Sequence, residues 1–101
     1  MIKVLINYEE KEFKSLEVKG HSNSAPRGED LVCAAVSAVV TGGMNALKNP
    51  KDFELKLEEG HAFIKVKEAV SSHDEIVLET LIVGLKTIAE GNEKFIQIKN
   101  L

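Results

Sequence analysis

The 101-residue sequence has no tryptophan, one cysteine and two prolines. A single cysteine excludes an internal disulfide and a zinc site built from cysteines. No apolar run reaches the roughly 18–20 residues that a membrane-spanning helix needs. The start, MIKVLINYEEKEF, alternates and carries charge early, unlike a signal peptide. We therefore expect a cytoplasmic protein without a membrane partner.

The sequence also has no excess of positive charge. Its 13 Lys and Arg residues and 16 Asp and Glu residues give a net charge of −3. Without a basic stripe to release counterions from a phosphate backbone, direct nucleic-acid binding is not expected. The 44% of hydrophobic and 29% of charged residues are typical of a soluble globular chain. The length predicts one domain, residues 1–101, whose modest core a dimer interface would supplement.

Hydrophobic periodicity predicts the order ββαββαβ. Alternating segments predict strands over residues 2–8, 13–19, 52–58, 62–67 and 94–98. Two helices are expected, over 31 to about 47 and from about 73 to 90. This order indicates an α+β domain with a mostly antiparallel sheet and two helices packed on it.

The first helix is apolar all round, which predicts that it is buried. Gly42 and Gly43 lower its helix propensity, and close packing against a neighbour would explain them. In the second helix, Ser72 and Glu75 form a predicted capping box, and Gly91 fits the C-terminal cap. The expected buried residues of this helix are Ile76, Val77, Leu81, Leu85 and Ile88. His61 and His73 are expected to face solvent.

The single cysteine, Cys33, falls in the first turn of the first helix, after a polar loop. The partial positive charge of a helix N-terminus stabilises a thiolate, which is the reactive form of cysteine. The same free N–H groups can hold an oxyanion. His21 lies twelve positions earlier, at a strand end, and could act as the base. This spacing permits contact between the two side chains but does not enforce it.

Plainer interpretations exist for each of these residues. Cys33 could be a small core residue, and His21 a solvated one. Asp30 is a good N-cap for the first helix, and could instead orient His21. Ser37, one turn after Cys33, could line the same pocket or bond its own helix backbone. No metal-ligand spacing and no cofactor motif occurs, so neither a metal nor a cofactor is expected.

The most specific run is GHSNSAPRGEDLVCAAVS, residues 20–37. It resembles the ribosomal-processing cysteine protease family, whose pattern is Gly-His, a glycine-containing loop, then Asp-Ile/Leu-Val-Cys-Ala with Ser one turn later. The resemblance covers the whole chain in length and in element order. Two loop positions differ, because Ser22 and Arg27 stand where family loops often have alanine and an aromatic residue.

The resemblance implies a cytoplasmic bacterial endopeptidase, typically a homodimer. Its substrate would be the large-subunit ribosomal protein numbered twenty-seven, from which it removes a short N-terminal extension for ribosome assembly. The implied roles are nucleophile for Cys33 and general base and acid for His21, with Asp30 and Ser37 in support. The implied substrate-loop residues are Gly20, Ser22, Asn23, Ser24 and Gly28.

Two other functions stay open from the sequence. One is a non-catalytic module that binds a ribosomal protein or an extended peptide, in which Cys33 would be a core residue. The other is a thiol-dependent enzyme that acts on a small molecule. The paired Gly-His and Asp-x-x-Cys motifs favour the protease over both.

Overall fold

The computed structural model describes residues 1–21 and 30–101, so the predicted loop residues Ser22, Asn23, Ser24 and Gly28 lie outside the described residues. The predicted order ββαββαβ is confirmed, with one short 3₁₀-helix, η1, added after α1. The elements are β1 (Ile2–Glu9), β2 (Glu12–Lys19), α1 (Leu31–Asn45), η1 (Pro50–Asp52), β3 (Phe53–Glu58), β4 (His61–Val66), α2 (Ser72–Ala89) and β5 (Ile96–Asn100).

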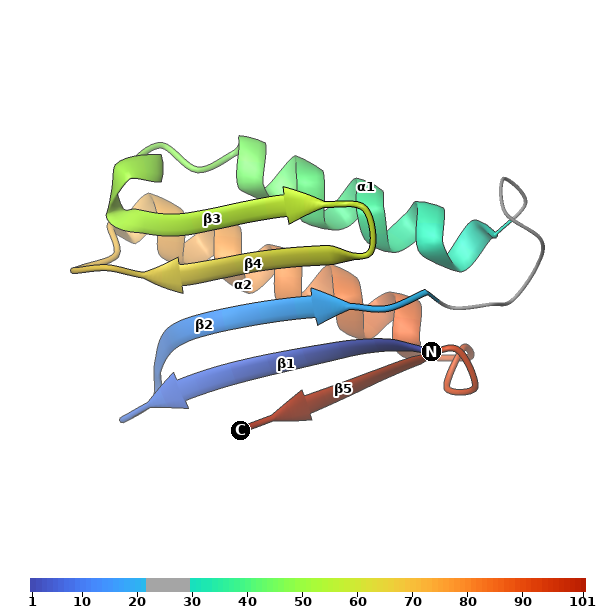
Figure 1. Cartoon of the computed structure of the whole chain (residues 1–101). Coiled ribbons are helices and arrows are strands. Elements are labelled where there is room, and N and C mark those ends of the chain that lie inside the picture. The colour runs from blue at the N-terminus through green and yellow to red at the C-terminus, as the bar shows by residue number, and fades with distance from the viewer. Residues whose placement is uncertain (22–29) are drawn as a thin grey trace.

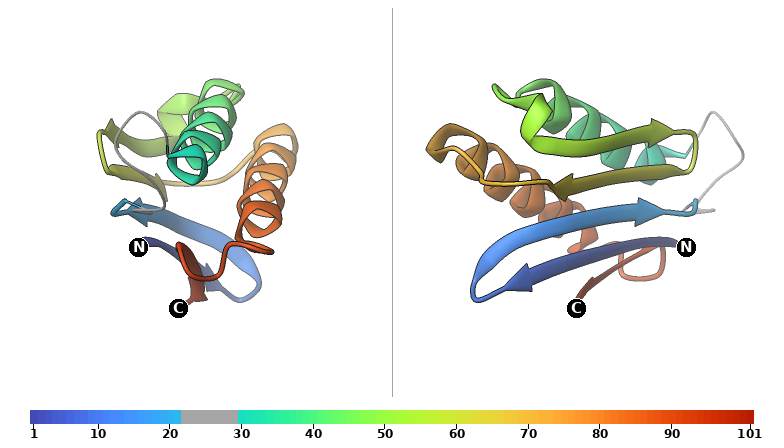
Figure 2. Two further views of the ribbon diagram at one scale, coloured as in Figure 1. Left: turned by 90° about the vertical axis from the view of Figure 1, so that its right-hand side faces the viewer. Right: turned by 60° about the vertical axis from the view of Figure 1, so that its left-hand side comes forward.

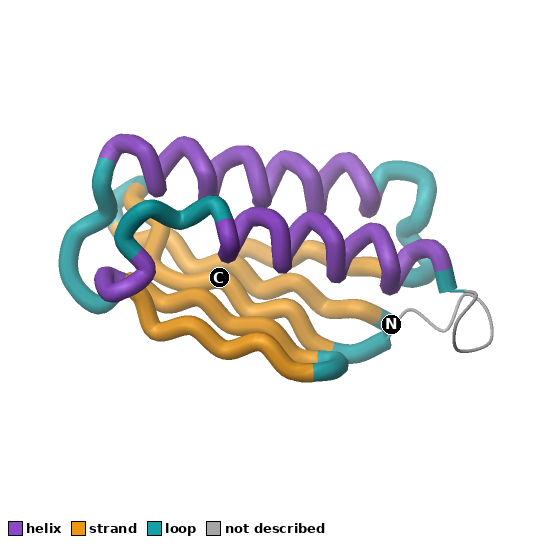
Figure 3. Tube along the Cα trace, turned by 90° about the horizontal axis from the view of Figure 1, so that it is seen from above, coloured by secondary structure: helices purple, strands orange, loops and turns teal. Residues whose placement is uncertain are grey.

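The five strands form one sheet in the order β3-β4-β2-β1-β5 (Figure 1). The pairs β1–β2, β2–β4 and β3–β4 are antiparallel, and β1–β5 is parallel. Both helices cover the same face of this sheet (Figure 2), where they lie side by side (Figure 3). The result is a two-layer α+β architecture with a mostly antiparallel sheet, as predicted. In the described part of the chain, no helix is long and apolar enough to cross a membrane.

The core lies between the two layers. Every second residue of a strand points to the helices, so Val4 and Ile6 of β1 pair with Val18 and Leu16 of β2 on the buried face. The helices contribute Val32, Val36 and Val40 from α1 and Leu78, Leu81, Ile82 and Leu85 from α2.

The first helix, which was expected to be buried, is buried on one side only. Its buried residues recur every four positions and form one stripe, whereas Leu31 is 80% exposed. A helix in a two-layer fold has a second layer on one side only, so its other side stays uncovered. Ile76 of α2 was likewise expected in the core, but it lies on the outer side of its helix and is 63% exposed.

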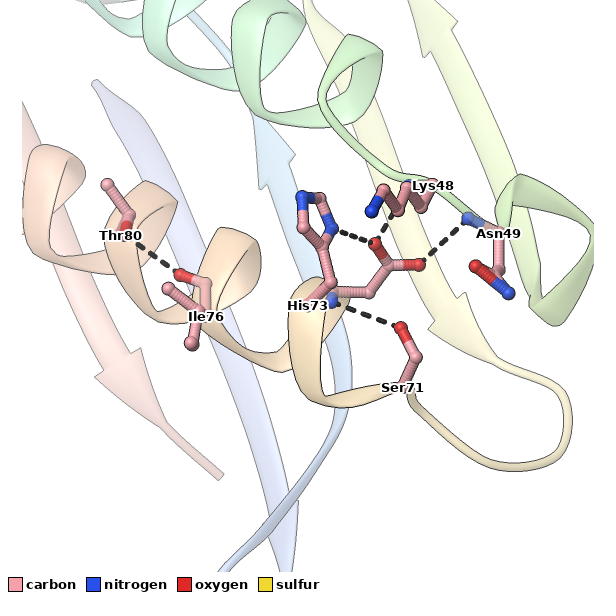
Figure 4. A network of polar contacts seen from close by, with 7 residues as sticks. Lys48, Asn49, Ser71, His73, Ile76 and Thr80 are labelled. Atoms are coloured by element: carbon pink, nitrogen blue, oxygen red, sulfur yellow. Dashed lines mark hydrogen bonds and ion pairs between the residues drawn. The ribbon is translucent and has the colours of Figure 1, made fainter.

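The start of α2 differs from the predicted capping box. The N-cap is Ser71, not Ser72, and its hydroxyl accepts a hydrogen bond from the Asp74 N–H at 3.2 Å. His73 is not a purely solvated residue, because its Nδ1 lies 2.9 Å from an Asp74 carboxylate oxygen. The carboxylate is fully buried and also accepts the backbone N–H groups of Lys48 and Asn49 (Figure 4). This network fastens the segment after α1 to the start of α2.

The two adjacent glycines of α1 have different surroundings. A Cβ added at Gly43 would overlap the side chain of Leu81 in α2, whereas a Cβ at Gly42 would meet nothing within 4 Å. Close packing of the two helices therefore explains why a glycine stands at position 43, as predicted, but it does not explain the glycine at position 42.

We expect Gly43→Ala to lower the free energy of unfolding by about 1–3 kcal/mol, because the methyl group overpacks the α1–α2 contact. The matched variant Gly42→Ala should raise it by about 0.5–1 kcal/mol through helix propensity alone. Urea unfolding of both variants measures the difference. Equal effects at the two positions would show that Leu81 does not restrict Gly43.

Candidate functional site

The candidate site lies at the end of the molecule where β2 ends, α1 begins and β3 turns into β4 (Figure 1). These three segments surround a cavity of about 590 Å³. All the described residues that the sequence singled out for chemistry line it, namely Gly20, His21, Asp30, Cys33 and Ser37. The chain thus brings His21 and Cys33 to one cavity, although twelve positions separate them.

The N-cap of α1 sets the position of Cys33. Asp30 is the N-cap, with extended backbone, and its carboxylate accepts the N–H of Cys33 at 3.0 Å. The predicted capping role of Asp30 is confirmed, and its role in orienting His21 stays a prediction. Cys33 itself is half-buried and lies in the first turn of α1.

His21 follows β2 and is exposed. Its position is set by the neighbouring hairpin, because the N–H of Gly20 donates to the carbonyl oxygen of Gly60 at 3.0 Å. Gly60 lies in the turn between β3 and β4, and the imidazole of His21 lies directly beside it. The ring is therefore placed between solvent and the cavity, where a base that must exchange protons can work.

The cavity has an apolar wall and a polar wall. Aliphatic side chains from the sheet and from α1 form the first, namely those of Ile2, Val18, Ala34, Val36, Val40, Leu57 and Ala62. The polar wall carries, beside the residues named above, Glu58, Glu59 and His61. An apolar hollow with a few convergent polar groups is the usual character of a binding site for an organic ligand or a peptide side chain.

The residues of the β3–β4 turn were missed by the sequence reasoning. They reach the site because β4 pairs with β2, which sets His61 opposite Lys19. His61 was expected to face solvent, but it is half-buried and its Nε2 lies 2.7 Å from the Glu17 carboxylate. A short-range sequence pattern does not show which hairpin lies beside which strand. The one signal in the sequence that this turn belongs to the site is the pair Gly60-His61, which repeats the Gly-His pattern of residues 20–21.

Within the described residues, no three histidine, cysteine or acidic side chains are arranged to hold a metal ion. The cavity brings together the Cys33 thiol, the imidazoles of His21 and His61, and the start of α1 with its first N–H groups. This set is sufficient for nucleophilic acyl transfer.

The sequence model of the cysteine protease Prp family matches residues 1–97 of this chain. The chain belongs to the Prp family of cysteine proteases. Ribosomal processing cysteine protease Prp of Bacillus subtilis is 37% identical over 82 residues, which cover 73% of each chain. The Prp of Staphylococcus aureus strain Mu50 is 30% identical over 83 residues, 78% of each chain.

Several solved structures share the fold. The crystal structure of S. aureus Prp with a covalently linked product peptide superposes with a TM-score of 0.90 at 26% identity, and each chain is covered completely. S. aureus Prp with a substrate peptide gives a TM-score of 0.84 at 25% identity, again over both whole chains. SMU.848 of Streptococcus mutans gives 0.80 at 26% identity, over 100% of this chain and 94% of the other. The present Prp-family chain is therefore a cysteine peptidase.

Proposed function

We propose that this chain is the endopeptidase that removes a short N-terminal extension from the large-subunit ribosomal protein numbered twenty-seven. One observation carries the proposal. A cysteine peptidase needs a cysteine nucleophile, and the only cysteine of this sequence lies in the first turn of α1 and lines one cavity with His21. We assign Cys33 as the nucleophile and His21 as the general base and acid.

The reaction follows from these two assignments. His21 takes the proton of the Cys33 thiol, and the thiolate sulfur attacks the carbonyl carbon of the scissile peptide bond. N–H groups at the start of α1 hold the negative oxygen of the tetrahedral intermediate. The intermediate collapses to a thioester as the C–N bond breaks, and His21 gives its proton to the leaving amine. Water, deprotonated by His21, then hydrolyses the thioester and restores the thiol.

The other candidate residues support this pair. Asp30 keeps the Cys33 N–H bonded and so fixes the first turn of α1. Ser37 lines the cavity one turn further along α1. We assign Gly20, Ser22, Asn23, Ser24 and Gly28 to binding the substrate backbone.

The substrate is proposed from the chemistry of the cavity and from the relatives. The apolar wall suits an aliphatic or aromatic side chain beside the scissile bond. The relatives from B. subtilis and S. aureus are ribosomal processing proteases, which supports a ribosomal protein as the substrate. The proposal includes a cytoplasmic homodimer and requires no cofactor.

The test is incubation of the purified protein with the full-length ribosomal protein, followed by intact-mass measurement. We expect a single cut that shortens the N-terminus and leaves the rest whole. The same ribosomal protein made without its extension should stay intact, and Cys33→Ser should cut neither form. Equal processing by the wild type and by Cys33→Ser would refute the proposal, as would the absence of any cleavage.

A further inference from the structure

We propose that Gly60, in the turn between β3 and β4, is a positioning residue for His21. The inference rests on the proposed role of His21 as base and acid. It concerns a segment that lies about forty residues from His21 in the sequence and contributes no side chain to the chemistry.

Two contacts join Gly60 to the segment that carries the imidazole. The Gly60 carbonyl oxygen accepts the N–H of Gly20 at 3.0 Å, which fixes the backbone one residue before His21. The Nε2 edge of the His21 ring lies next to the position that a Cβ of Gly60 would occupy. The turn therefore fixes the main chain before the proposed base and borders the space in which its ring lies.

Only glycine leaves room for this arrangement. A Cβ at Gly60 would lie 3.0 Å from Nε2, 3.4 Å from Cε1 and 3.8 Å from Cδ2 of His21. Carbon atoms in good contact lie about 3.5–4.0 Å from their neighbours, so a Cβ alone requires the ring to move by a few tenths of an ångström, and a longer side chain takes up more of this space. The φ of Gly60 is +76°, a left-handed conformation that a tight turn demands and that glycine adopts without strain.

The displacement matters because the imidazole of His21 must reach the Cys33 thiol in the proposed reaction. Its Nε2 edge faces the turn, so the Nδ1 edge is the part of the ring farther from Gly60. A shift of the ring alters the approach of either nitrogen to the Cys33 thiol. Misplacement of a reacting group by about 1 Å can cost roughly 100-fold in rate.

The experiment compares Gly60→Asn with Gly91→Asn. Asparagine tolerates the left-handed region better than other side chains, so both variants should keep their turns. Gly91 is the matched control, because its φ is +84° and a Cβ there would meet nothing within 4 Å. Thermal unfolding confirms that both variants are folded.

We expect Gly60→Asn to lower kcat for peptide cleavage by about 10- to 100-fold with little change in KM, and Gly91→Asn to leave both unchanged. In ¹H–¹⁵N spectra at fixed pH, the ring signals of His21 should shift in Gly60→Asn only, with those of His73 as the internal reference. Wild-type kcat and unshifted His21 signals in Gly60→Asn would overturn the inference.

The ring signals need no turnover, so the inference and the proposed function can fail separately. If the wild type cleaves no peptide, the proposed function fails. Shifted His21 signals in Gly60→Asn would still support Gly60 as the residue that positions the ring, and unshifted signals would overturn it.

Discussion

Cys33→Ala should lower kcat for cleavage of the proposed ribosomal substrate by about 10⁶-fold, the order of loss that follows removal of the nucleophile in a serine peptidase. No second thiol exists in the chain to replace it. What remains is catalysis by the N–H groups of α1 and by binding, which act on an attacking water only weakly.

His21→Ala should cost nearly as much, and the double variant little more than either single one. In the proposed mechanism the thiol and the imidazole act as a unit, so the loss of either one removes the contribution of both. Additive losses in the double variant would contradict the pairing of Cys33 with His21. Single-turnover assays by mass spectrometry cover the needed range, and circular dichroism with thermal unfolding confirms that each variant is folded.

Binding measurements on the same variants separate substrate binding from catalysis. Cys33→Ala keeps the cavity and its apolar wall, so it should still bind the uncut ribosomal protein. Isothermal titration with this variant then reports the affinity for the substrate in the absence of turnover. Weak binding by Cys33→Ala together with full binding by His21→Ala would place Cys33 in the binding surface instead of the chemistry.

The sequence predicted the sheet and the start of α1 because both depend on short-range patterns. Alternation in β1 and β2 reflects the period of two of a strand with one buried face. Asp30 followed by an apolar helix predicted an N-cap, and the bond from the Cys33 N–H confirms it. The likeness of residues 20–37 to a protease family then indicated which of the two interpretations of Cys33 to prefer.

The parts that the sequence did not predict depend on tertiary contacts. An Ala- and Val-rich helix has no polar face, so its composition does not show which side meets the sheet. At α2, Ser71 and Ser72 each precede an acidic residue by three positions, and both fit the capping pattern. Ser71 is the N-cap in the structure, because a helix that begins there places Asp74 where its carboxylate accepts the backbone N–H groups of Lys48 and Asn49.

Asp74 is also where the largest loss of stability is expected. Its side chain is fully buried and accepts three hydrogen bonds, at 2.8 Å from Lys48 N–H, 3.0 Å from Asn49 N–H and 2.9 Å from His73 Nδ1. Burial by itself raises the pKa of the Asp74 carboxyl, but the hydrogen bonds from His73, Lys48 and Asn49 outweigh it and hold the pKa below its ordinary value. The carboxylate is thus ionised and bonded in the folded protein.

Asp74→Asn keeps the shape of the side chain but sets an amide NH₂ against a backbone N–H, so at least one donor loses its acceptor. We expect the free energy of unfolding at pH 7 to fall by about 3 kcal/mol, a large share of the roughly 5–15 kcal/mol that stabilises a typical domain. The matched control is Glu75→Gln, which removes the same charge from an exposed side chain in the same turn of α2 and should cost well under about 1 kcal/mol. Urea unfolding measures all three proteins.

The pH dependence of the unfolding free energy shows whether Asp74 stabilises the fold by its charge or only by its packing. Because the pKa of Asp74 is lower in the folded than in the unfolded chain, its stabilisation is complete above the unfolded value of about 3.9. This stabilisation is lost as the pH falls through the pKa that Asp74 has in the folded protein. The gap in unfolding free energy between wild type and Asp74→Asn should therefore be wide at pH 6–7 and narrow progressively below about pH 4. A gap that stays constant down to pH 3 would mean that Asp74 stabilises the chain by its shape and not by its charge.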